Sequence, residues 1–163
     1  MTCQPLEAER WRLSFPEPEG YFIISVLARL ARHYKQDVME LPPAQRAFWQ
    51  GNLTRNKPAQ GSDLAESQEV LSEARAELRS ERQALAENWV RDFEIAENRN
   101  PWIVEITTTD RDEFVAMLND RRLLLGLEMG ITEDDMEMGL HGMTDEQRRA
   151  AILEIDVLGH FIM

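Results

Sequence analysis

The segment 110–131, DRDEFVAMLNDRRLLLGLEMGI, constrains the fold most, because it combines a helical apolar pattern with start and stop signals. Asp110 and Glu113 resemble a capping box, and Gly130 is a suitable residue to end the helix. The apolar side chains fall on two opposite faces: Phe114, Val115, Leu118, Leu125 and Met129 on one, and Ala116, Leu123 and Leu127 on the other. Because a helix apolar on both sides is expected to be enclosed by neighbours, we predict a central buried helix at about 110–130.

A glycine lies well inside this predicted helix. Gly126 is less favourable there than alanine by about 1 kcal/mol, because glycine loses more backbone freedom. We therefore expect a neighbouring backbone to approach closely at Gly126.

Two short segments alternate between apolar and polar residues, as half-buried strands do. The apolar positions are Trp11, Leu13 and Phe15 in residues 10–15, and Trp102, Val104 and Ile106 in residues 102–107. A two-stranded ribbon is marginal in isolation. We therefore expect the two segments to pair and to rest on the helices.

Helical periodicity also marks residues up to about 35, a short segment after Pro42, a long segment at about 63–95 and the last residues from 144. In the long segment, leucines recur every seven residues, at Leu64, Leu71, Leu78 and Leu85. This narrow seam is typical of a helix in a bundle or of a pair across a dimer axis. We predict that the Glu and Arg residues on the rest of its surface are exposed.

These elements predict a mainly α fold, a helical bundle around the central helix with the small β ribbon at about 10–15 and 102–107. At 163 residues the chain is expected to form a single domain, 1–163. The stretch 52–62 is rich in Gly, Pro and Asn, and we predict a mobile loop there.

Charge and composition exclude several classes of protein. The net charge is −12, and residues 61–163 carry most of the acidic excess, so nucleic-acid binding is not expected. The longest apolar run, 21–31, is interrupted by Ser25 and Arg29 and is too short for a membrane span. The single cysteine, Cys3, and an N-terminus without an apolar signal core predict a cytoplasmic protein.

No motif with an attached chemistry is present. The sequence has no phosphate-binding loop, dinucleotide fingerprint, HExxH pair or paired CxxC, and no nucleophile elbow. The acidic run at 133–137 is explained by the favourable placement of carboxylates at a helix start. We therefore expect no enzyme activity, no cofactor and no metal site.

Arg122 is the charge that most needs an explanation. It falls beside the Leu118 and Leu125 stripe, and a guanidinium keeps its proton, so its burial requires an acceptor. We predict Asp156 of the last helix as its partner, with Asn119 and Asp120 facing outward. Two interpretations stay open. The candidate site of Arg122, Asp156 and Asn119 is either a structural ion pair or an anion-binding site in a helix-lined pocket.

The residues LNDRRLLLG at 118–126, followed by MGIT at 129–132, resemble the signature LNDxRLxLGxRLGIT of a bacterial family, domain of unknown function family two thousand and seventeen. Arg121 stands where that family has an apolar residue, and Glu128 where it has an arginine. The reversed charge at Glu128 prevents any anion-binding role of the family arginine from being transferred. The resemblance implies a bacterial cytosolic protein and supplies no activity.

The expected function is therefore that of a non-catalytic regulatory or adaptor protein acting through protein–protein contacts. The partner is a protein of unknown identity, and a homodimer through the leucine seam is a further expectation. The alternative is a small-ligand or anion-binding protein that uses a buried arginine, Arg122.

Overall fold

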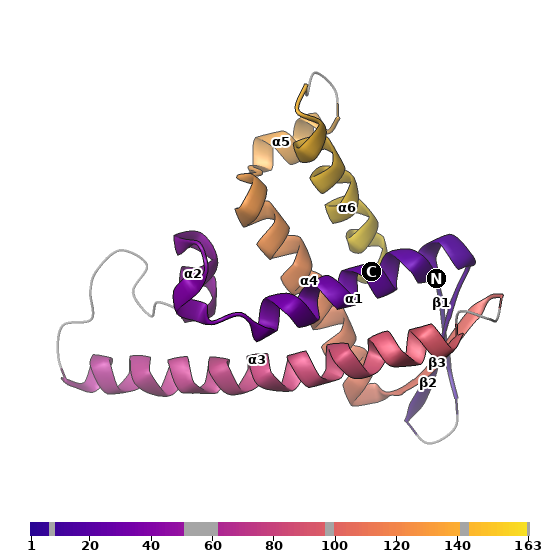
Figure 1. Cartoon of the computed structure of the whole chain (residues 1–163), viewed down its shortest axis with the longest axis horizontal. Coiled ribbons are helices and arrows are strands. Elements are labelled where there is room, and N and C mark those ends of the chain that lie inside the picture. Colours follow the sequence, from indigo (N-terminus) through magenta and orange to yellow (C-terminus); the bar gives the residue numbers. More distant parts are fainter. Residues whose placement is uncertain (7–8, 51–61, 97–99, 141–143, 163) are drawn as a thin grey trace.

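The computed structural model describes residues 1–6, 9–50, 62–96, 100–140 and 144–162, with the backbone alone at 62–65 and 95 (Figure 1). The predicted loop at 52–62 lies outside these residues, except for Ser62. In chain order the elements are β1 (Thr2–Pro5), β2 (Arg10–Phe15), α1 (Glu17–Lys35), the 3-10 helix η1 (Val38–Glu40), α2 (Pro43–Gln50), α3 (Ser62–Ala96), β3 (Trp102–Thr107), α4 (Thr108–Met129), α5 (Glu133–Met138) and α6 (Glu146–Ile162).

The helices dominate the architecture, so the predicted mainly α class is confirmed. α3 runs along one side of the molecule with α1 packed against it, and α4 crosses α1 and projects beyond it together with α6 (Figure 1). α5 joins α4 and α6 at their far end, α2 packs on α3 and α4, and the sheet lies near the C-terminal end of α3. Among the described residues, no helix has both the length and the apolar character needed to cross a bilayer.

The sheet has three antiparallel strands in the order β1-β2-β3. The pairing of 10–15 with 102–107 is confirmed with the predicted bounds, and Leu13 lies opposite Val104. β1 was not predicted, because its four residues are all exposed and show no apolar alternation. β2 leads through Pro16 into α1, and β3 continues directly into α4.

α4 begins at Thr108, slightly earlier than its sequence signal suggested. Thr107 is the N-cap, its side chain accepts from the Asp110 backbone N–H, and the Asp110 side chain accepts in return from Thr107. Gly130 ends the helix in the left-handed conformation, as predicted. The helix therefore starts immediately after β3, which fixes its direction relative to the sheet.

The main core lies where the sheet, α1, α3 and α4 meet. The apolar stripe of α1 is buried. Its neighbours in this core include Phe15, Trp89, Phe93, Trp102, Phe114 and Leu118. Gly20 is required at the sheet-facing start of α1, because an added Cβ would lie 2.5 Å from Cδ2 of the buried Trp102 ring.

The prediction that α4 is enclosed on two sides is wrong for its second face. Leu118 and Leu125 are buried as expected, but Leu123 is 47% and Leu127 41% exposed. The sheet, α1, α2 and α6 all pack on α4, yet none of the described elements covers Leu123 and Leu127. α4 is therefore a core helix with one open apolar face.

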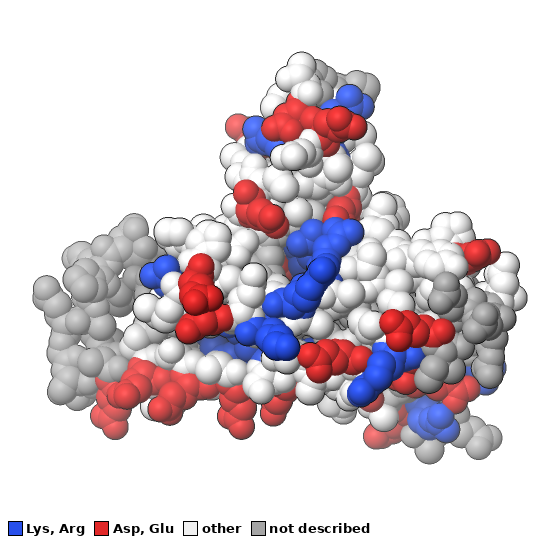
Figure 2. Space-filling model, viewed as in Figure 1, with Lys and Arg blue, Asp and Glu red and all other residues white. Residues whose placement is uncertain are grey.

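Acidic side chains cover the outer side of α3. Figure 2 shows a row of carboxylates along the edge of the molecule where α3 runs, and the exposed Glu66, Glu69, Glu73 and Glu77 belong to this helix. Leu71, Leu78 and Leu85 are half-buried, and Leu85 packs against the main core. The part of the leucine seam at Leu85 is therefore used within the chain, and a homodimer through the seam stays a prediction.

Candidate binding groove

The predicted ion pair between Arg122 and Asp156 does not form. Asp156 is exposed, and its carbonyl oxygen accepts from the ring Nδ1 of His160, at 2.8 Å. α6 turns Ile155 and Gly159 toward α4, and the guanidinium carbon of Arg122 would lie 3.9 Å from a Cβ on Gly159. Asp156 lies next to Ile155 in sequence and thus about 100° around the helix, on the solvent side.

Arg122 has no hydrogen-bond acceptor or ion-pair partner among the described residues. Its side chain is half-buried, and its Nε is a buried donor without a partner. Four other arginines also bury an unpartnered Nε, but each donates elsewhere through a terminal nitrogen. These are Arg12 to Glu105, Arg46 to the Leu41 carbonyl, Arg79 to the His33 carbonyl and Arg148 to Asp135. Because an unsatisfied buried donor is unfavourable, Arg122 is exceptional among these five.

Arg122 lines a groove of about 660 Å³ on the open face of α4. We call this the α4 groove. α4 contributes Asn119, Arg122, Leu123, Gly126 and Leu127, and the remaining lining residues are Phe48, Gly130, Ile131, Thr132, Glu133, Met136 and Ile155. The structure thus brings Arg122 and Asn119 into one site, and Asp156 does not line it.

Gly126 lies in the α4 groove, and the described residues give no packing reason for a glycine there. A Cβ built on it would meet no heavy atom of the described residues within 4 Å, so the predicted close approach of a neighbouring backbone is not found among them. A glycine inside a helix still lowers stability by about 1 kcal/mol relative to alanine. The groove floor is therefore open at a position where the fold itself would accept a side chain.

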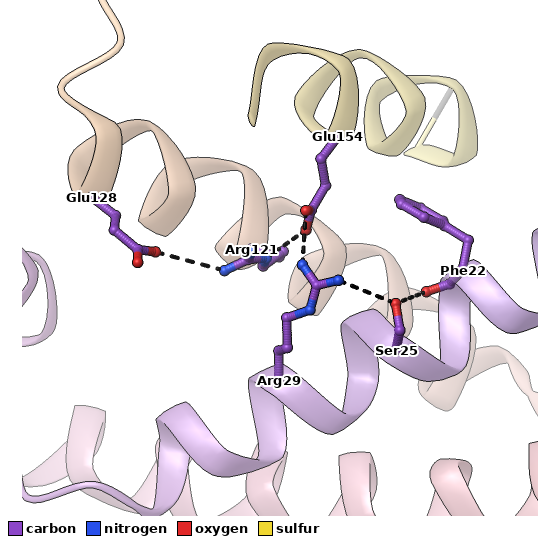
Figure 3. Close-up of polar contacts among 6 residues, drawn as sticks. All are labelled: Phe22, Ser25, Arg29, Arg121, Glu128 and Glu154. Carbon is purple, nitrogen blue, oxygen red and sulfur yellow. Dashed lines mark hydrogen bonds and ion pairs between the residues drawn. The ribbon is translucent and has the colours of Figure 1, made fainter. Parts of the chain in front are cut away.

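Arg121, adjacent to Arg122 in sequence, does have ion-pair partners. Its Nε donates to Glu154 of α6 at 2.7 Å, and Glu154 also accepts from Arg29 of α1 at 2.8 Å (Figure 3). Arg121 further approaches Glu128 on the next turns of α4, at 4.0 Å. Glu154 is thus held between two guanidinium groups, and it joins α1, α4 and α6.

A buried polar cluster links α1, α3 and α4 on the other side of α4. Asp120, only 7% exposed, accepts from the Tyr34 hydroxyl at 2.8 Å and from Nη1 of Arg82 at 2.7 Å. Arg82 also donates through Nε to Glu113 at 3.0 Å. Burial raises the pKa of Asp120, and the charge of Arg82 opposes that shift. The expectation that Asp120 faces outward is therefore wrong.

The same cluster extends to α2. Arg79 is 5% exposed, lies over the Trp49 ring at 5.2 Å and donates to the carbonyls of His33 and Gln36 at the end of α1. Nε1 of Trp49 donates to Nε2 of His33 at 2.9 Å. Burial, assisted by the charges of Arg79 and Arg121, lowers the pKa of His33 to about 4. These contacts join three helices, and none of their residues lines the α4 groove.

Sequence reasoning missed this cluster, although a signal was present. Arg75, Arg79 and Arg82 are spaced four and three residues apart, and the same spacing continues through Ala86, Trp89 and Phe93. The buried apolar stripe of α3 thus continues into its arginines, which were predicted to be exposed. A guanidinium at a core position of a helix predicts acceptors on the neighbouring elements.

The described residues contain no group of three or more His, Cys, Asp or Glu placed to hold a metal ion. No protein-family model, curated protein or solved structure matches the chain. The resemblance of residues 118–132 to the family of unknown function therefore stays a prediction. The α4 groove is therefore the feature of the described residues that bears on function.

Proposed function

We propose that this chain is a non-catalytic binding protein of regulatory or adaptor type, and that its partner protein docks in the α4 groove. The observation that carries this proposal is the open apolar face of α4, with Leu123 and Leu127 nearly half exposed beside Phe48 and Met136. Grouped apolar side chains of this kind are typical of interaction surfaces. A partner segment that covers them removes apolar surface from water, which favours association.

Arg122 in the α4 groove supports a second candidate function. The volume of about 660 Å³ lies within the range of small-ligand sites, about 300–1,000 Å³, and Arg122 is available to an anionic group. A small anion-binding protein is therefore the alternative. The partner-protein function is preferred, because the two exposed leucines extend the apolar surface along α4 beyond the neighbourhood of Arg122.

Affinity capture from the source cell with two matched variants tests the proposal. The groove variant is Leu123→Lys/Leu127→Lys, at positions 47% and 41% exposed. The control is Leu153→Lys/Val157→Lys on α6, where the exposed fractions are 48% and 40% and neither residue lines the groove. We expect the wild type and the control to retain the same proteins and the groove variant to lose them.

The two pairs have nearly equal exposed fractions, so a general effect of replacing exposed apolar side chains would act on both. Capture that is unchanged in the groove variant, or lost equally in both variants, contradicts the proposal. Circular dichroism and urea unfolding of each variant verify that the fold is retained.

A further inference from the structure

We infer that the occupant of the α4 groove is an amphipathic helix of the partner protein that places a carboxylate on Arg122. This inference rests on the proposed function and specifies the chemistry of the docking segment. Three features of the described residues support it. They are the missing acceptor of Arg122, the open position at Gly126 and the helical origin of the lining residues.

The charge of the occupant follows from Arg122. Its guanidinium lies against Gly159 of α6, its Nε is buried, and none of its nitrogens donates within the described residues. A carboxylate can accept two parallel hydrogen bonds from the two terminal nitrogens of a guanidinium, an arrangement that does not require the buried Nε. The neighbouring Arg121 already pairs with Glu154. No carboxylate of the described residues pairs with Arg122, including that of Glu133 in the groove lining.

The helical form of the occupant follows from the groove walls. The lining residues come from α2, α4, α5, α6 and the link between α4 and α5, and no strand edge lies among them. The backbone N–H and C=O groups of an extended peptide would therefore have no strand edge to hydrogen-bond with. A helix, in contrast, satisfies its own backbone hydrogen bonds. An apolar groove between helices is a known way of binding an amphipathic helix, through residues at i, i+3 or i+4 and i+7.

The size of the groove agrees with a short helix. Asn119 and Leu127 delimit the α4 part of the lining, and eight residues of rise correspond to about 12 Å, or about two helical turns. Gly126 lies between them and presents no side chain, so a docked helix can approach the α4 backbone at that level. This close approach accounts for a glycine that the fold of the chain does not require.

The groove carries opposite charges at its two ends, so the docked helix should carry the complementary charges. Arg122 lies near one end of the α4 row, and the exposed Glu133 lines the other end, beside Thr132. The fitting segment therefore carries an acidic residue near one end, apolar residues over Leu123 and Leu127, and a tolerated basic residue near the other end.

A display library of 16-residue peptides, fully randomised and panned on the complete chain, provides the probe. We expect enrichment of helical patterns with apolar residues at i, i+3 or i+4 and i+7 and of Asp or Glu at one fixed position. The best peptide, labelled for fluorescence anisotropy, should bind Arg122→Gln at least about tenfold more weakly than the wild type. Arg32→Gln is the control, because Arg32 is exposed on α1 and does not line the α4 groove.

A reciprocal exchange identifies the contact directly. Arg122→Glu should abolish binding of the acidic peptide and should bind the peptide in which its Asp or Glu is replaced by Arg. Because Arg122 has no partner among the described residues, each variant is expected to fold, and circular dichroism verifies this.

The failures of the two proposals are distinguishable. If Leu123→Lys/Leu127→Lys abolishes peptide binding but Arg122→Gln does not change it, the carboxylate contact is overturned and docking in the groove stands. If the groove variant and the Leu153→Lys/Val157→Lys control bind the peptide equally, both proposals fail. A library without binders, together with Arg122-dependent binding of decanoate, overturns the helical occupant and favours the small anionic ligand.

Discussion

Asp120 and Arg122 lie two positions apart on α4 and have opposite surroundings. Asp120 is buried in the polar cluster, where Tyr34 and Arg82 donate to it. Arg122 lies at the α4 groove, and no acceptor for it is present among the described residues. A charge whose partners all come from the chain contributes to holding the elements together, whereas a charge without partners is available to another molecule.

Two helical glycines repeat this contrast. Gly20 in α1 faces the Trp102 ring so closely that a Cβ would overlap it, so the packing of the core explains the residue. Gly126 in α4 faces open space. Contacts among the described residues therefore explain Asp120 and Gly20 on the core side. They do not explain Arg122 and Gly126 on the groove side. The following experiments test that difference.

Asp120→Ala should have the largest effect. It leaves the guanidinium of Arg82, 11% exposed, without its closest partner and the buried Tyr34 hydroxyl without its acceptor. Removing one member of a buried ion pair lowers the free energy of unfolding by about 3–5 kcal/mol. Urea unfolding followed by circular dichroism measures this change.

Arg122→Ala is the comparison for that experiment. Since Arg122 is half-buried and unpaired, its loss should lower the free energy of unfolding by less than about 1 kcal/mol, through packing of its aliphatic stem. A loss as large as that of Asp120→Ala would show that Arg122 also has a structural partner and would remove the contrast between the two residues.

Gly20→Ala should have an intermediate effect. The new Cβ would lie 2.5 Å from Cδ2 of Trp102, a side chain only 1% exposed, so the core has to shift. Overpacking of this kind lowers the free energy of unfolding by about 1–3 kcal/mol. Gly126→Ala is the matched substitution in the groove and should instead raise stability by about 0.5–1 kcal/mol. Thermal unfolding measures both variants. A loss of stability in both would contradict the contrast between Gly20 and Gly126.

Acidic pH should also lower the stability of the folded protein, and it should act through the polar cluster. The pKa of His33 is about 4 in the folded protein, below its ordinary value of 6.5. Between these values the unfolded chain binds a proton that the folded chain does not, so stability is full above pH 6.5 and falls as the pH decreases toward 4. The raised pKa of Asp120 acts in the opposite direction, because the folded state then binds its proton more readily.

His33→Gln separates the two contributions. It keeps an acceptor for Trp49 without a group that titrates, and Asp120 is unchanged. The urea midpoint of the wild type should fall more than that of the variant between pH 7 and pH 4.5. Equal falls would show that His33 does not contribute to the acid sensitivity.

Much of the fold follows from local patterns. The alternation of residues 10–15 and 102–107 correctly predicted two strands and their pairing, and the apolar stripe of α1 correctly predicted its buried face. β1 has no such pattern, because all four of its residues are exposed. In the candidate site, the sequence correctly predicted that Arg122 and Asn119 take part. It could not predict Phe48 and Met136, because only the packing of α2 and α5 brings them to the α4 groove.

The sequence by itself determined where the α-helices and the strands β2 and β3 form, because their periodicity is a property of neighbouring residues. It did not determine which charges are buried. Arg82 and Asp120 are separated by 38 residues, and their contact depends on which faces α3 and α4 turn toward each other. The packing of the helices also leaves Leu123 and Leu127 exposed and Arg122 unpaired among the described residues. Only the tertiary structure decided that Asp120 belongs to the core and that Arg122 lines a groove, because burial depends on the elements packed around a residue.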